Sequence, residues 1–145
     1  MDFSLHESIS YWIKKIYQET GHLYNERLAQ YGLTTAQVSV LALLWNSGDG
    51  QTQKDLHEKL RIRPASLSNV LDMLVAGGWV MRKQDSDDAR VKRIYLTEAG
   101  FAQKSVCADI LADIEQHVRK NLAPEETAVL LMWLKKIEGS LRKEE

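Results

Sequence analysis

Small polar side chains and arginines gather between residues 61 and 69, in a pattern suited to contacts with nucleic acid. Asparagine can pair with adenine through two hydrogen bonds, serine can bond a base edge or a phosphate, and alanine can touch a thymine methyl group. Arginines placed just ahead of such residues would meet phosphate. An ordinary solvated helix face is the alternative, because polar outward residues are common on surface helices. The candidates are Arg61, Arg63, Ala65, Ser66, Ser68 and Asn69.

A second charged cluster occupies residues 82–93, where basic side chains are interspersed with aspartates. Arg90 lies near the tip of an expected turn, and an extended arginine there can enter a minor groove, where narrow A·T stretches focus negative potential. Asp88, two residues earlier, is placed to hold the turn or to orient Arg90. A solvated hairpin of mixed charge is the competing interpretation. The candidates on this segment are Arg82, Lys83, Asp88, Arg90 and Lys92.

One acidic residue, Asp72, falls on the same helix face as the polar candidates. A carboxylate on that face would repel phosphate. We therefore expect Asp72 to pair with a nearby base, with Arg82 as the first choice. A solvated carboxylate without a partner is the alternative.

Three short helices and a β-hairpin are needed to position these side chains, and the sequence predicts all four within residues 33–100. The helices are expected over residues 35–47, over residues 53–60 and from Pro64 to Gly77-Gly78, with strands at 79–83 and 91–96. This is the order of a winged helix-turn-helix, a mainly α fold with a small β-hairpin wing. Such an element can place one helix in a DNA major groove and a cationic wing beside it.

Helical spacing of apolar residues predicts the buried face of each short helix. Thr34 and Gln37 form a plausible capping box for the helix over 35–47, and Thr52 caps the next helix. The polar candidates near Pro64 fall opposite the apolar face of their own helix. The positions expected to be buried are Val38, Leu41, Leu44, Trp45, Leu56, Leu60, Leu67, Val70, Leu71 and Leu74.

Long helices are predicted at both ends of the chain, over residues 4–31, from Thr97 to about Asn121, and from Pro124 onward. Their apolar stripes are too extensive for one small winged core to cover. Packing against the same helices of a second subunit would cover them, so we expect a two-fold homodimer formed by residues 4–31 and 100–143. On the last helix the expected buried residues are Val129, Leu130, Trp133, Leu134, Ile137 and Leu141.

Length and composition are those of one globular domain spanning residues 1–145, with 44% hydrophobic and 27% charged residues. The net charge is −1, yet residues 51–96 hold nine Lys/Arg against six Asp/Glu, so positive charge is concentrated on the winged segment. No apolar run approaches the ~18 residues of a membrane span, and the first residues lack the pattern of a signal peptide. We therefore expect a cytoplasmic protein with no membrane partner.

Catalytic and metal motifs are missing from the sequence. There is no phosphate-binding glycine loop, nucleophile elbow or paired-carboxylate motif, so we expect no enzyme activity and no cofactor. The four histidines have no i, i+4 pair, and zinc ligands would have to converge from separate helices, so we expect no metal. Cys107, the only cysteine, lies on or beside an apolar stripe and is expected to be a buried, inert thiol.

Several of these segments together resemble the multiple antibiotic resistance regulator (MarR) family of bacterial transcription factors. The resemblance covers about half of the chain, and the flanking helices match the family's dimerisation helices in order and length. One departure is Ala89, where the family usually has the first arginine of Asp-Arg-Arg, and Ser86 replaces a common proline. The matching residues are Leu33-Thr34-Thr35-Ala36-Gln37, Val40-Leu41, Leu56, Ile62, Ser66-Leu67-Ser68, Leu71-Asp72-Met73-Leu74, Gly78-Trp79-Val80-Met81-Arg82, Asp85-Ser86-Asp87-Asp88-Ala89-Arg90 and Leu96-Thr97-Glu98-Ala99-Gly100.

The resemblance implies a homodimer that binds a pseudo-palindromic double-stranded DNA operator, usually as a repressor. It also implies release of the DNA by a small, often aromatic or anionic, effector bound between the dimer helices and the winged domain. A winged protein-interaction module without DNA binding is the alternative from another class. The tentative effector-binding residues are Trp12, Tyr17, His22, Tyr24 and Trp45, for which core or dimer-interface packing is the alternative.

Overall fold

The computed structural model describes residues 4–142, which are mainly helical with one small antiparallel sheet. The chain forms two compact units, one reaching Leu111 and the other starting at Ala112. In chain order the elements are η1 (Leu5–Glu7), α1 (Ile9–Ala29), α2 (Thr35–Ser47), β1 (Gln51–Thr52), α3 (Gln53–Leu60), α4 (Pro64–Ala76), β2 (Val80–Gln84), β3 (Lys92–Leu96), α5 (Glu98–Arg119) and α6 (Pro124–Arg142).

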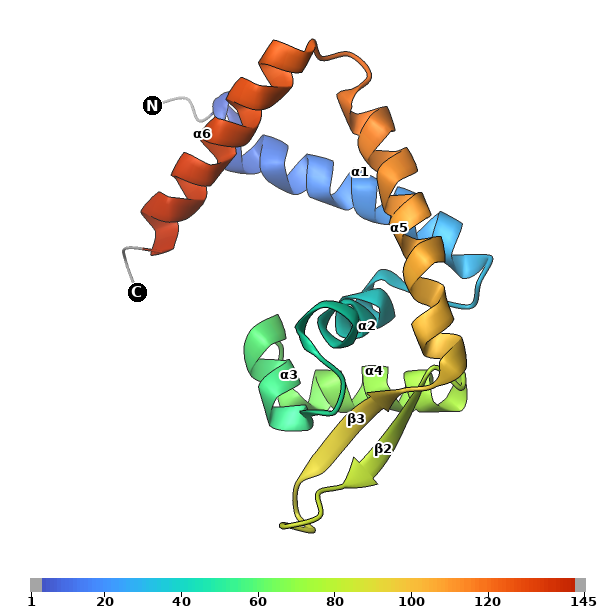
Figure 1. Cartoon of the computed structure of the whole chain (residues 1–145). Coiled ribbons are helices and arrows are strands. Elements are labelled where there is room, and N and C mark those ends of the chain that lie inside the picture. The colour runs from blue at the N-terminus through green and yellow to red at the C-terminus, as the bar shows by residue number, and fades with distance from the viewer. Residues whose placement is uncertain (1–3, 143–145) are drawn as a thin grey trace. The chain divides into compact units, whose positions relative to one another are not determined.

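Helices α2, α3 and α4 and the sheet form the winged core of the first unit, as predicted. Helix α2 packs against α3 and α4, and the β2–β3 hairpin extends beyond the three helices (Figure 1). Leu41, Leu56, Leu71 and Ile94, which come from four different elements, are completely buried. These side chains fix the relative positions of the helices and the wing because they share one apolar core.

The sheet has one strand more than the hairpin that the sequence predicts. Strand β3 pairs with β2 from Val80 opposite Leu96 to Gln84 opposite Lys92, and β1 pairs with the other edge of β3. A two-residue strand has no detectable alternation, so no pattern indicated β1. Its pairing ties the entry of α3 to the wing.

The predicted helix boundaries of the winged core are confirmed by their caps. Thr34 accepts a hydrogen bond from the Gln37 amide, and the Gln37 side chain accepts one from the Thr34 amide, which completes the capping box. Thr52 caps α3 through the Asp55 amide. Pro64 occupies the first turn of α4, and Gly78 adopts a φ of 76° just beyond its end.

Some expectations for the first unit are wrong in detail. The first helix does not run unbroken from residue 4, because Ser8 is extended and its hydroxyl caps a new helix through the Tyr11 amide. Among the residues expected to be buried, four are only half-buried: Val38, Trp45, Leu60 and Val70. On α2 the fully buried valine is Val40. Val38 instead faces a pocket described below, so the helix has apolar neighbours on two sides.

Helix α6 of the second unit leaves its large apolar side chains uncovered within one chain. Helix α6 has no buried residue, and Trp133 is 55% exposed. Leu130 and Leu134, expected to be buried, are also exposed, as are Ile9 and Ile16 on α1 of the first unit. The expected burial of α6 is therefore not achieved by the single chain. No helix within residues 4–142 is both long enough and apolar enough to cross a membrane.

Candidate nucleic-acid interface

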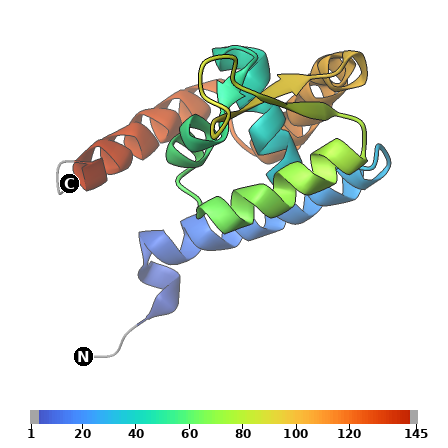
Figure 2. The same cartoon turned by 90° about the horizontal axis from the view of Figure 1, so that it is seen from below.

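The outward face of α4 carries the small polar residues that the sequence singled out. Ala65, Ser66 and Asn69 are exposed near its N-terminal end. In the view from below, no other element lies in front of α4 at any point along its length (Figure 2). Short side chains at this end of the helix allow its backbone to approach base edges closely.

Ser68 occupies a less open position than its neighbours. It is half-buried, and the Gln53 side-chain amide donates to its hydroxyl oxygen over 3.2 Å. The Ser68 hydroxyl keeps its own proton for donation. Gln53 was not among the sequence candidates, because it precedes Ser68 by a whole helix and turn. Gln53 links the first residue of α3 to the outward face of α4. We call this surface, formed by Ala65, Ser66, Ser68 and Asn69, the reading face, and α4 the reading helix.

Arg82 pairs with Asp72, which confirms the expected partner for that acid. The Arg82 Nη1 atom lies 2.5 Å from Asp72 Oδ1, and Nη2 donates to the Ser68 carbonyl oxygen over 3.2 Å. The Arg82 side chain is only 25% exposed. The guanidinium of Arg82, a candidate for DNA contact, therefore joins β2 to the side of α4.

The turn between α3 and α4 presents Arg61 and Arg63, as expected. Both residues are exposed. Arg61 ends α3 in the left-handed conformation with a φ of 53°, and Arg63 is the N-cap residue of α4. Both cations therefore lie at the corner of the helix-turn-helix that precedes the reading helix.

At the wing tip, Asp88 both holds the turn and pairs with Arg90. Its carboxylate accepts from the Arg90 amide over 3.0 Å and from Arg90 Nε over 3.1 Å. The guanidinium beside it lowers the pKa of the Asp88 carboxyl. The Arg90 side chain remains 90% exposed, so this contact orients the cation without covering it.

A second ion pair stiffens the base of the wing turn. Arg93 Nε donates to Asp85 Oδ1 over 2.6 Å, and Arg93 Nη1 donates to the Gly50 carbonyl oxygen. The Arg93 hydrogen bond holds the pKa of the Asp85 carboxyl below its ordinary value. The wing is thus tied to the segment before β1, a contact that no spacing in the sequence indicated.

Two further wing lysines lie on the surface. The Lys83 ammonium sits 5.3 Å from the centre of the Tyr95 ring, and Lys92 is exposed on β3. Arg82 and Arg93 are bound to acids and half-buried, whereas Arg90 stays exposed beside Asp88. The exposed positive charge of the wing therefore comes mainly from Lys83, Lys92 and Arg90.

The start of α5 is held tightly against the beginning of the wing. Thr97 donates through its amide to the Trp79 carbonyl and through its hydroxyl to the Gly78 carbonyl, over 3.1 and 2.6 Å. A Cβ on Gly100 would lie 2.0 Å from the Trp79 carbonyl oxygen, so only glycine fits there. The Leu-Thr-Glu-Ala-Gly segment is therefore the joint between wing and long helix.

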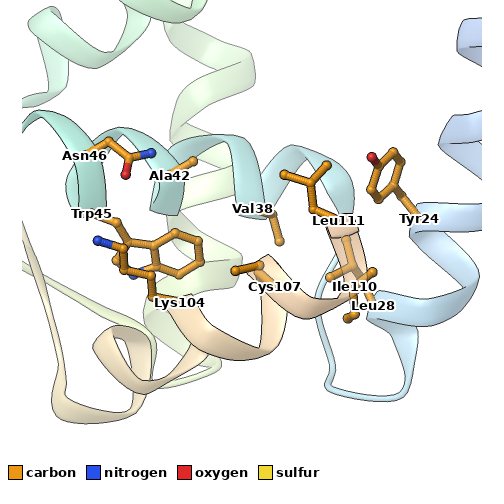
Figure 3. Close-up of a pocket in the computed structure, with 11 residues that line it drawn as sticks. Tyr24, Leu28, Val38, Ala42, Trp45, Asn46, Lys104, Cys107, Ile110 and Leu111 are labelled. Carbon is orange, nitrogen blue, oxygen red and sulfur yellow. The ribbon is translucent and has the colours of Figure 1, made fainter. Parts of the chain in front are cut away.

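A largely apolar pocket of about 220 Å³ lies between α1, α2 and α5 within the first unit (Figure 3). Tyr24 and Trp45, two of the five tentative effector residues, line it. Trp12, Tyr17 and His22 do not, and Tyr17 is 77% exposed. The other lining residues are Leu28, Val38, Ala42, Asn46, Lys104, Cys107, Ala108, Ile110 and Leu111.

Cys107 forms part of the pocket wall. Its side chain is buried, and burial raises the pKa of the thiol. A thiol in that state is a poor nucleophile, because the thiolate is the reactive form. Among residues 4–142, no cluster of three or more His, Cys, Asp and Glu side chains could hold a metal ion.

Helices α3 and α4 form a helix-turn-helix whose second helix is exposed, and a basic β-hairpin wing follows it. This arrangement defines a winged helix-turn-helix DNA-binding protein. The MarR family model matches residues 33–92. The multiple antibiotic resistance protein MarR of Escherichia coli (strain K12) is 32% identical over 126 residues, which cover 86% of this chain and 87% of that protein. The chain belongs to the MarR family.

Solved structures agree with this assignment. A crystal structure of a MarR mutant from E. coli complexed with operator DNA has a TM-score of 0.79 at 32% identity, covering 89% of this chain and 92% of that one. The MepR–DNA complex of S. aureus has a TM-score of 0.80 at 27% identity, covering 92% and 98% of the two chains. The chain is therefore a DNA-binding transcriptional regulator and not an enzyme.

Proposed function

We propose that the chain is a homodimeric repressor that binds a pseudo-palindromic operator and is released by a small-molecule effector. The observation that carries the DNA-binding part is the uncovered face of α4 beside a wing whose tip arginine is oriented and exposed. A homodimer presents two such faces related by a two-fold axis, which is why a pseudo-palindromic site is the expected target.

Base reading is assigned to the N-terminal half of α4. Asn69 has the side chain best suited to adenine, and Ser66 and Ser68 supply hydroxyls for a base edge or phosphate. Ala65 is short enough to leave the bases accessible. Arg61 and Arg63 supply phosphate contacts that fix the register of the helix on the duplex.

The wing is assigned to the DNA backbone and the minor groove. Arg90 supplies the extended cation at the tip, Asp88 orients it, and Lys83 and Lys92 lie along the strands. Arg82 is assigned a positioning role, because its contacts with Asp72 and the Ser68 carbonyl connect the wing to the reading helix.

Self-association is supported by the apolar surface that one chain leaves uncovered. The exposed apolar side chains of α1 and α6 are far more numerous than isolated surface residues would be, and large uncovered apolar patches mark interaction sites. A second copy of the chain is the simplest cover, because it supplies matching helices. The exposed large apolar residues of these two helices are Ile9, Trp12, Ile13, Ile16, Tyr17, Leu23, Val129, Leu130, Leu131, Met132, Trp133, Leu134 and Leu141.

Effector binding is assigned to the pocket between α1, α2 and α5. Its apolar wall with Trp45 and Tyr24 suits an aromatic body, and Lys104 offers one cation for an anionic group (Figure 3). An aromatic compound suits the apolar wall, and an anionic group suits Lys104. Ligand pockets of this kind combine an apolar wall with few polar groups.

Selection of bound duplexes from a random DNA pool, followed by titration at several salt concentrations, tests the proposal. We expect a two-fold related consensus and an affinity that falls steeply with salt, because phosphate contacts release counterions. A protein that retains no duplex at low salt would contradict DNA binding and favour a protein-interaction module. A consensus without two-fold symmetry would contradict recognition by a symmetric dimer.

A further inference from the structure

Trp45 both lines the pocket and forms a hydrogen bond to the first turn of α5. Its ring lines the pocket between α1, α2 and α5, toward the same end as Lys104 (Figure 3). Its indole N–H donates to the carbonyl oxygen of Gly100 over 3.1 Å. The same side chain is therefore part of the pocket wall and a tie between α2 and the first turn of α5.

Gly100 cannot move without disturbing the wing. Its amide donates to the Thr97 hydroxyl over 3.0 Å, and that hydroxyl is within hydrogen-bond distance of the Gly78 and Trp79 carbonyls. A Cβ added to Gly100 would lie 2.0 Å from the Trp79 carbonyl oxygen, so no side chain fits. Trp79 is the last of the three residues that connect α4 to strand β2.

We infer that Trp45 is a positioning residue that couples occupation of the pocket to DNA binding. An occupant that turns the indole removes its bond to Gly100 and shifts the joint that sets the wing against α4. Coupling requires an element with two arrangements that both sites bias, and here that element is the indole, either bonded to Gly100 or displaced. The inference rests on the proposed function, since it explains how its effector would release DNA.

Ser39 provides a matched control on the same helix as Trp45. Its side-chain hydroxyl also donates to a backbone carbonyl, that of Thr35, over 2.9 Å, yet Ser39 is exposed and does not line the pocket. Trp45→Phe and Ser39→Ala each remove one hydrogen bond from a side chain to a backbone carbonyl. Only Trp45→Phe breaks the tie to Gly100.

The experiment uses full-length protein, a duplex selected from the random pool, and anilinonaphthalene sulfonate as an apolar anionic probe. Loss of bound-probe fluorescence in Ala42→Trp, which fills the pocket with a larger side chain, checks that the probe occupies the pocket. DNA affinity is then measured with and without saturating probe for the wild type, Trp45→Phe and Ser39→Ala. Sedimentation of each variant checks that its oligomeric state is unchanged.

We expect the probe to weaken DNA binding of the wild type and of Ser39→Ala by about fivefold or more, the usual lower range of coupling between sites. For Trp45→Phe we expect both ligands to bind and the antagonism to shrink to less than about twofold. Equal antagonism in Trp45→Phe overturns the inference, and so does a probe that occupies the pocket but leaves wild-type DNA binding unchanged. Failure of the wild type to bind any duplex contradicts the proposed function instead.

Amide hydrogen exchange measures the effect of the probe on the joint directly. It uses the wild type alone, so it does not depend on the folding of any variant. The Thr97 and Gly100 amides are both hydrogen-bonded at the joint, whereas the Gln37 amide lies in the α2 cap. We expect the probe to raise exchange at Thr97 and Gly100 and to leave Gln37 unchanged. Unchanged exchange at the joint, with the pocket occupied by the probe, overturns the inference.

Discussion

Single side chains on α4 and at the wing tip divide the task of DNA recognition between base identity and charge. Asn69 is exposed on a helix face of short side chains, so it can reach a base without moving the backbone. Arg90 is exposed and oriented by Asp88, so its guanidinium has a defined position at the wing tip and remains accessible to DNA. The two residues therefore call for different measurements.

For Asn69→Ala we expect a change in sequence preference. Loss of a bidentate contact costs about 1–3 kcal/mol at one base position, so discrimination at that position should fall while other positions keep theirs. Titration of operator variants changed one base pair at a time measures this. Equal weakening on operator and random DNA would assign Asn69 to the backbone.

For Arg90→Ala we expect weaker operator binding and a shallower dependence on salt. Each neutralised phosphate contributes a slope near −0.9 in log–log terms, and the loss should be greatest where A·T pairs lie under the wing. Ala89→Arg, which restores the family pattern, should tighten binding to operator and random DNA alike. Unchanged affinity of Arg90→Ala at two salt concentrations, with the same sedimentation behaviour, would falsify the role of the wing.

At the scale of elements, two carboxylates that bind arginines hold the turn of the wing. Asp85 and Asp88 have pKa values below the ordinary 3.8. Their charged forms therefore support the wing above that pH, and the support is lost as pH falls through the lowered values. We expect the carbon NMR signals of both carboxyls to titrate below 3.8, and the pKa of Asp85 to rise in Arg93→Met but not in Lys92→Met. An Asp85 titration unaffected by Arg93→Met would contradict the ion pair.

The joint between the wing and α5 depends on one glycine. Gly100→Ala would place a methyl group 2.0 Å from the Trp79 carbonyl oxygen. Overpacking of this kind costs about 1–3 kcal/mol, so the urea midpoint should fall, with Gly139→Ala as a control because its added methyl meets open space. A Gly100→Ala variant as stable as the wild type would show that the joint relaxes freely.

Local signals were enough to predict the winged core. The capping box at Thr34, Pro64 at the start of α4 and the glycines after it each act within a few residues, so the sequence alone places them. The Arg93–Asp85 pair depends on hairpin register, and Gln53–Ser68 on the packing of two helices, so neither follows from spacing. The pocket was only partly predicted, because its residues converge from three helices and aromatic type alone does not separate pocket from surface.

For the whole molecule, the prediction concerns association. Deletion of the chain from Pro124 onward should leave insoluble or dissociated protein, because it removes apolar helix surface that the proposed dimer buries, while the winged core keeps its own buried residues. Analytical ultracentrifugation of the full-length and shortened chains measures this. A full-length chain that sediments as a monomer at micromolar concentration would contradict the homodimer.

Helix α6, with no residue buried by its own chain, also affects how the protein responds to dilution. If a second copy completes the burial, then the melting temperature depends on protein concentration, because mass action favours the associated state. A cell that makes few copies would hold chains whose last helix lacks its packing partner, and such chains are the ones open to proteolysis. The amount of regulator would then be limited by its own lifetime at low abundance, independently of any effector.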